Sequence, residues 1–165
     1  MPLRANLGLN IAGQYDRTPG AVEAPASILN AIFPVVYGDG SGANQASILY
    51  SATRTITSAS NESLDMNGTA LTDSFGAAIA FARIKAIIIQ ASAANTTNLT
   101  IANVTNSVTT LLGSTYSLVL QPGEMLAKAT PSAAGYVVTA GTADLLNVAN
   151  ASGASASYTI VVIGA

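Results

Sequence analysis

Residues 81–90 read FARIKAIIIQ, and this stretch decides the fold class of the chain. It is the most apolar segment of the sequence. Its three consecutive isoleucines, at positions 87–89, favour an extended backbone because β-branched side chains pack well on a pleated surface. The wider segment 76–91 is rich in alanine, so a helix over those residues is the alternative. We favour a central β-strand.

Eight further segments have the β-branched and aromatic content or the alternation of short strands. Turn signals such as Asn67-Gly68 and Pro122-Gly123 separate them. The eight segments are 47–58, 62–66, 98–104, 117–120, 125–129, 136–139, 145–149 and 158–163. About eight or nine short strands with this spacing predict an all-β domain over residues 43–165, an antiparallel, jelly-roll-like β-sandwich.

Residues 1–42 differ from the rest of the chain because glycines and prolines interrupt them without a clean period. We interpret them as an extended N-terminal arm. Residues 24–37 (APASILNAIFPVVY) are apolar and compatible with one short helix, capped near Ser27 and cut by Pro34. Such an arm frays unless something holds it. We therefore expect residues 1–40 to exchange amide hydrogens fast in isolated protein and to become ordered in an assembly.

The composition excludes several classes of function. The chain has no histidine, cysteine or tryptophan, and 8% of its residues are charged, with a net charge of −2. Histidine and cysteine are the usual groups of catalysis and of soft metal binding at neutral pH, so we expect no enzyme and no cofactor. Six scattered basic residues argue against nucleic acid. No apolar run is long enough for a membrane span, and no secretory signal follows Met-Pro-Leu-Arg.

Three carboxylates lie close together in the sequence, at Glu62, Asp65 and Asp73. Paired carboxylates serve glycoside hydrolysis or bind hard cations. The nearby glycine does not fall where an EF-hand loop needs it, and tryptophan is missing as a platform for sugars. We expect capping and turn roles for these side chains and no catalytic role. The sequence leaves a bound cation at this place open.

Three stretches carry a resemblance to a known class of protein: GSGANQAS (40–47), ITSASNESLDMNGTALTDSFGAAIAFARIKAIII (56–89) and AGYVVTAGTADLLNVANASGASASYTIVVIGA (134–165). In order and texture, residues 40–165 resemble small β-sandwich virion proteins of tailed bacteriophages, of the head-decoration or cement type. The arm matches this class less well.

The resemblance implies a capsid decoration protein that forms homotrimers on the virion surface. Such a protein is made in the host cytoplasm, binds the major capsid protein and stabilises the head. By extension, apolar side chains of the arm are expected to make the capsid or inter-subunit contacts. They are Leu3, Leu7, Leu9, Ile11, Tyr15, Ile28, Ile32 and Phe33. Some of these residues could instead cover the end of their own sandwich.

Two other functions compete with capsid decoration. One is a tail-tube, tail-tip or fibre-associated virion domain, which would assemble as rings or fibres. The other is a carbohydrate-binding module, in which tyrosines would stack on sugars in place of the missing tryptophan.

Overall fold

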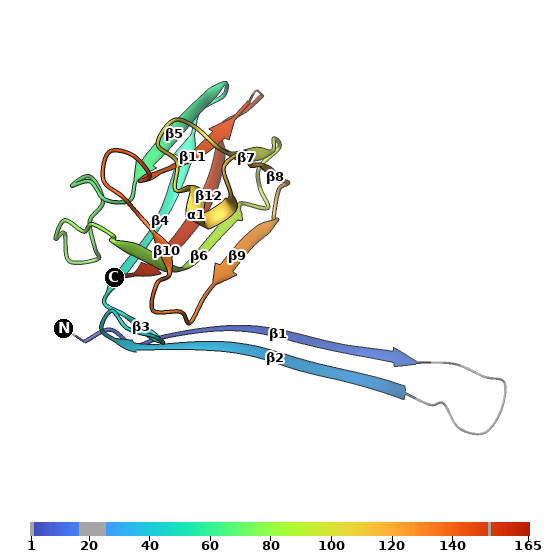
Figure 1. The fold of residues 1–165 in the computed structure, drawn as a ribbon. Helices are drawn as coiled ribbons and strands as arrows, with labels where there is room; N and C mark the ends of the chain where they lie inside the picture. Colours follow the sequence, from blue (N-terminus) through green and yellow to red (C-terminus); the bar gives the residue numbers. More distant parts are fainter. Residues whose placement is uncertain (1, 17–25, 152) are drawn as a thin grey trace.

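The computed structural model describes residues 2–16, 26–151 and 153–165. These residues form twelve β-strands and one short helix, so the fold is all-β, as the sequence predicts (Figure 1). In chain order the elements are β1 (Ala5–Asp16), β2 (Ala26–Asp39), β3 (Gln45–Ala46), β4 (Ile48–Ile56), β5 (Ser60–Asp65), β6 (Arg83–Ala91), β7 (Leu99–Ala102), α1 (Thr109–Leu112), β8 (Ser117–Leu120), β9 (Met125–Ala129), β10 (Tyr136–Val137), β11 (Leu145–Asn150) and β12 (Ala156–Gly164).

Nine strands form the body of the molecule as two antiparallel sheets. In the five-stranded sheet the order is β10-β6-β12-β4. The fifth strand, β9, pairs with the same edge of β6 as β10 does, each with a different part of β6. The four-stranded sheet has the order β5-β11-β7-β8. One continuous apolar core lies between the sheets, built from alternate residues of their strands, among them Ile87, Ile89, Ile101, Val148 and Ile160. This is a sandwich, whereas the jelly-roll connection of its strands stays a prediction.

Residues 81–90 contribute the central strand of the larger sheet, so the helix alternative for residues 76–91 is wrong. β6 pairs with β12 along one edge, with Ile87 opposite Val162 and Ile89 opposite Ile160. Its other edge pairs with β9, where Ile88 lies opposite Ala127. The β-branched run fits this position because its side chains are packed on both sides of the ladder.

All nine strands predicted for residues 43–165 are present, two of them, β8 and β9, with the predicted bounds. The sequence analysis missed the two-residue strand β3 and the single helical turn α1. Among the described residues, no helix is long and apolar enough to cross a membrane.

The helix expected over residues 24–37 is wrong. Within that range the structure describes residues 26–37, and they belong to β2, which pairs antiparallel with β1 over twelve residue pairs. A helix would need local hydrogen bonds that Pro34 interrupts, whereas a strand accepts a proline where its other edge is unpaired. Pro34 lies opposite Gly8 in this ladder. The arm is therefore a long β-hairpin that projects past the sandwich (Figure 1).

Candidate interaction surface on the N-terminal hairpin

The pairing of β1 with β2 sorts the side chains of the hairpin into two sides. Successive residues of a strand point to opposite faces, and directly opposed residues share a face. Leu7 pairs with Val35 and Leu9 with Phe33, so the odd-numbered residues of both strands lie together. Near the base of the hairpin these odd-numbered residues pack on the sandwich. We call the side of the hairpin that carries them the sheet-facing side. The even-numbered residues form the solvent-facing side.

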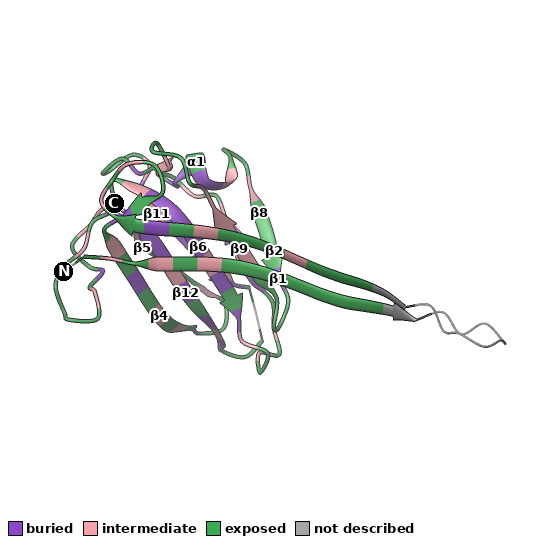
Figure 2. Cartoon of the chain, turned by 90° about the horizontal axis from the view of Figure 1, so that it is seen from below, coloured by how far each residue is buried: buried purple, intermediate pink, exposed green. Residues whose placement is uncertain are grey.

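The base of the hairpin packs on the outer face of the five-stranded sheet (Figure 2). Buried Tyr37 and Ala46 form a second apolar cluster with Ala86 of β6 and Ile163 of β12. The small side chain of Ala86 lets the hairpin approach the sheet closely. Leu3, Ala5, Leu7, Val35, Ala129 and Val161 pack around this cluster.

Hydrogen bonds fix the base in place. The hydroxyl of Tyr37 lies 2.9 Å from the carbonyl oxygen of Lys85 and 3.1 Å from that of Thr130, and it donates to this pair of acceptors. The pKa of Tyr37 is raised because burial disfavours its charged form. The backbone N–H of Leu3 donates to Asp39 Oδ1 at 3.0 Å, which ties the start of the chain to the end of β2.

Lys85 holds the loops that flank the base. Its side chain is fully buried, and burial lowers its pKa. The ammonium group nevertheless has acceptors, because it donates to the carbonyl oxygens of Gly42 at 3.2 Å, Ala133 at 2.8 Å and Ser132. Gly42 follows the hairpin, and the other two residues lie in the loop between β9 and β10. One buried cation therefore connects the arm to the sheet.

Farther from its base, the sheet-facing side of the hairpin is only partly covered by the rest of the described chain. Leu9, Ile11, Leu29 and Phe33 are 52%, 46%, 56% and 59% exposed. Burying such a half-exposed side chain completely contributes roughly 1 kcal/mol. A two-stranded hairpin alone is marginally stable in water, so the distal half of the arm is suited to a surface that covers it.

The solvent-facing side is apolar along β2 and polar along β1. Ile28, Ile32 and Val36 are 76%, 61% and 57% exposed. They lie opposite Gln14, Asn10 and Asn6 of β1. No charged residue occurs at positions 5–15 or 26–38. Both sides of the arm therefore offer apolar contact area whose burial removes no charge from water.

The structure separates the eight contact residues expected from the sequence into three groups. Leu3 and Leu7 are half-buried and pack against their own sheet. Leu9, Ile11, Ile28, Ile32 and Phe33 are exposed. Tyr15 belongs to β1, but its side chain lies outside the described residues. Sequence reasoning missed Leu29, on the sheet-facing side, and Val36, on the solvent-facing side. Apolar character, the criterion that selected the other residues, would have included both.

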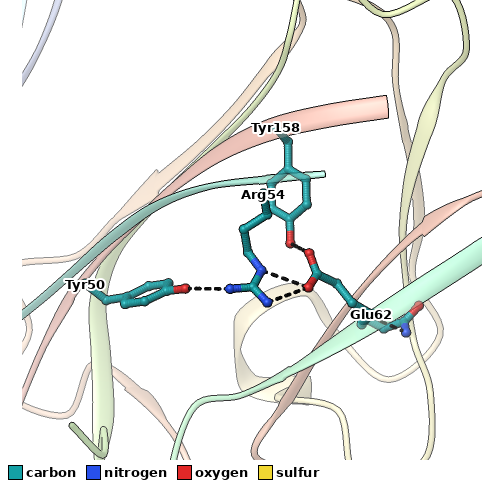
Figure 3. Close-up of polar contacts among 5 residues, drawn as sticks. Tyr50, Arg54, Glu62 and Tyr158 are labelled. Carbon is teal, nitrogen blue, oxygen red and sulfur yellow. Dashed lines mark hydrogen bonds and ion pairs between the residues drawn. The ribbon is translucent and has the colours of Figure 1, made fainter. Parts of the chain in front are cut away.

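A charged cluster of Tyr50, Arg54, Glu62 and Tyr158 lies between the two sheets (Figure 3). Glu62 of β5 accepts hydrogen bonds from Arg54 Nε and Nη2, both at 2.8 Å, and from the hydroxyl of buried Tyr158 at 2.5 Å. Arg54 Nη1 donates to the Tyr50 hydroxyl at 3.3 Å. Arg54 and Tyr158 belong to the five-stranded sheet and Glu62 to the other, so the cluster joins the two sheets.

The turn or capping role expected for Glu62 is therefore wrong, whereas the other two carboxylates in this part of the sequence serve turns, as expected. Asp65 Oδ1 accepts from the Asn67 N–H at 3.0 Å. Asp73 Oδ1 accepts from the N–H groups of Phe75 and Ala77 at 2.8 and 2.9 Å. In the described part of the chain, no three His, Cys, Asp or Glu side chains gather as metal ligands would.

Comparison of the chain with protein-family models, with curated proteins and with solved structures finds no match.

The Glu62 cluster predicts a loss of stability on substitution. Glu62→Gln removes the charge that Arg54 and Tyr158 share, and we expect the free energy of unfolding to fall by about 1–2 kcal/mol. Urea denaturation measures this difference. Thr53→Ala, on the outward side of the neighbouring strand β4, is the control and should change stability by less than about 0.5 kcal/mol. Equal effects of the two substitutions would contradict a stabilising role for the cluster.

Tyr158 predicts a loss of stability at alkaline pH. Burial, together with the hydrogen bond to Glu62, raises the pKa of Tyr158 in the folded chain. The unfolded chain loses this proton near the ordinary value of 10.0, whereas the folded chain keeps it. The contribution of Tyr158 to the free energy of unfolding should therefore be constant below that pH and fall as the pH rises above it. Tyr158→Phe should make the fall shallower in urea titrations at successive pH values, and an unchanged slope would refute this account.

The hairpin predicts a gradient of hydrogen exchange in the isolated chain. Amides at the base, such as those of Gly38 and Gly40, donate to the carbonyl oxygens of Asn44 and Ala46 and should exchange slowly. Amides of the distal half should exchange fast because that half has no covering layer. Tyr37→Ala should make the base exchange fast as well, while Ile32→Ala should leave it unchanged. Strong protection along the whole hairpin of a monomer would show that the arm needs no partner.

Proposed function

We propose that this chain is a structural virion protein of a tailed bacteriophage, a head-decoration or cement protein. In this role it binds the major capsid protein, forms homotrimers on the capsid surface and stabilises the head without enzymatic activity. The observation that carries the proposal is the hairpin arm, which has no charged residue at positions 5–15 and 26–38 and exposes apolar side chains on both sides. The resemblance of residues 40–165 to such proteins supports it.

The arm is suited to bracing a shell. Its base is anchored on the sandwich through Tyr37 and Lys85, so the distal half is held out in a defined direction. Residues 10–16 extend the strand by roughly 20 Å beyond Leu9, far enough to reach a neighbouring subunit. Docking through residues 5–15 and 26–38 would bury apolar area on both sides of the arm and would desolvate no charged side chain.

A second candidate is a tail or fibre protein, and the single projecting hairpin favours it as well. An arm that leaves a compact body in one direction could connect successive rings of a tube. Electron micrographs distinguish the two roles, because threefold features on heads support decoration, whereas rings or fibres support the tail.

Binding to heads tests the proposed function. Purified protein should cosediment with expanded heads that lack it and should restore their resistance to heat and low salt. Ile32→Asp places a charge on the solvent-facing side of the arm, far from the core, and should weaken binding about tenfold or more, because the charge would be buried without a partner.

The control for this experiment is Val119→Asp, which places the same charge on β8 at a residue that is 52% exposed. It should leave binding within about twofold of the wild type, since isolated surface substitutions away from an interface have small effects. If wild-type protein never associates with heads, and heads without it survive heat and low salt unchanged, the proposal is wrong.

A further inference from the structure

An exposed apolar patch lies at the end of the sheet where the hairpin begins. Phe75 is 78% exposed and Leu49 is 39% exposed. Together with Leu3 they line a hollow of about 470 Å³, whose wall also includes Pro2, Ser47, Asp73 and Ser74. We call the three apolar residues Leu3, Leu49 and Phe75 the Phe75 patch. The loop presents Phe75 in a fixed way, because the Asp73 carboxylate accepts from the backbone N–H groups of Phe75 and Ala77. A large aromatic side chain held in water by an ordered loop is typical of a contact residue.

The hairpin crosses the sheet from this patch toward the opposite edge. Leu3, just before β1, lies beside Leu49 of β4. Leu7 and Leu9 lie further along, beside Met125 and Ala127 of β9. β4 and β9 are on opposite sides of β12 and β6 in the sheet. Each copy therefore carries an apolar patch at the β4 edge and an uncovered apolar arm beyond the β9 edge.

The surface next to the Phe75 patch is also suited to an uncharged partner. The outward-facing residues of β4, β9 and β12 include no charged side chain. On β4 and β12 the hydroxyl groups satisfy one another, with Thr53 Oγ1 3.2 Å from Thr159 Oγ1 and Thr55 Oγ1 2.7 Å from Ser157 Oγ. Covering this face would leave few polar groups without hydrogen-bond partners. The desolvation free energy for packing a second apolar layer on it would therefore be small.

We propose that the distal sheet-facing side of the hairpin in one copy packs on the Phe75 patch of a second copy. The contact continues the interface that the chain already makes with itself, where the same side of the same hairpin covers the outer face of the same sheet. Leu29 and Ile11 of the arm would bury Phe75 and Leu49. This inference rests on the proposed function as an assembling virion protein. It adds that the partner of the sheet-facing side is a second copy of the same chain.

Such a contact is head-to-tail, because the two surfaces differ. Head-to-tail contacts close into a ring when the rotation between copies allows it and otherwise give filaments. A ring of three copies would account for the proposed trimer. It would also leave Ile28, Ile32 and Val36, on the solvent-facing side, free for the capsid.

Crosslinking of single-cysteine variants tests the contact, since the natural chain has no cysteine. We expect Leu29→Cys mixed with Phe75→Cys to be joined by a short bis-maleimide, while neither variant alone forms a crosslinked dimer. Ile28→Cys is the matched control, adjacent to Leu29 but on the solvent-facing side, and its mixture with Phe75→Cys should give no crosslink. Crosslinking of Leu29→Cys with itself, or equal yields from Ile28→Cys, would overturn the contact.

The mass of the protein in solution provides an independent measurement. Light scattering should show an oligomer for the wild type and for Ile28→Asp, whereas Leu29→Asp and Phe75→Asp should weaken self-association about tenfold or more by burying an unpaired charge. A monomeric wild type that yields no crosslink would overturn this inference, and binding of that monomer to heads would leave the proposed function intact. A crosslinked oligomer that does not bind heads would refute the proposed function alone.

Discussion

Strand β6 is packed on both faces, and the rest of the molecule is arranged around that constraint. Ile84, Ile87 and Ile89 point into the core between the two sheets. Ala86 points the other way and is covered by the base of the hairpin. A strand buried on both faces has an almost continuous apolar sequence instead of an alternating one, which explains residues 81–90. The hairpin is therefore a third layer over part of the fold, and the sandwich positions it through that layer.

The few charged side chains act mainly within the molecule. Arg54 and Glu62 join the two sheets, Lys85 binds three carbonyl oxygens beneath the arm, and Lys128 lies 4.7 Å from the centre of the Tyr136 ring. Asp144 and Glu124 accept backbone N–H groups in turns. Because these charges have internal partners, the outward faces of the hairpin and of β4, β9 and β12 remain neutral. These neutral faces can be covered by another surface without removing a charge from water.

The sandwich could be predicted from the sequence because each strand carries its own local signal and is bounded by turn residues. The hairpin could not, since residues 1–42 carry no clean alternation and the position of the arm depends on packing on Ala86 and Ile163. Apolar residues on both sides of β2 hid the period of two and made residues 24–37 compatible with a helix. The eight expected contact residues were chosen for their apolar character alone, so residues that anchor the arm, such as Leu7, were grouped with residues that it exposes, such as Leu9.

The anchorage of the hairpin also determines how reproducibly the arm is aimed. The hydrogen bonds of Tyr37 and Lys85 fix the base of the hairpin on the sheet. A small rotation at this base would displace the distal end of the arm by a larger distance. In the proposed assembly every copy has to reach the same place on its neighbour, so rotation at the base of the hairpin would disorder the whole array. Buried Tyr37 and Lys85 thus limit the range of angles that the hairpin can adopt relative to the sheet. Their hydrogen bonds are directional and fix an orientation that apolar packing alone would not determine.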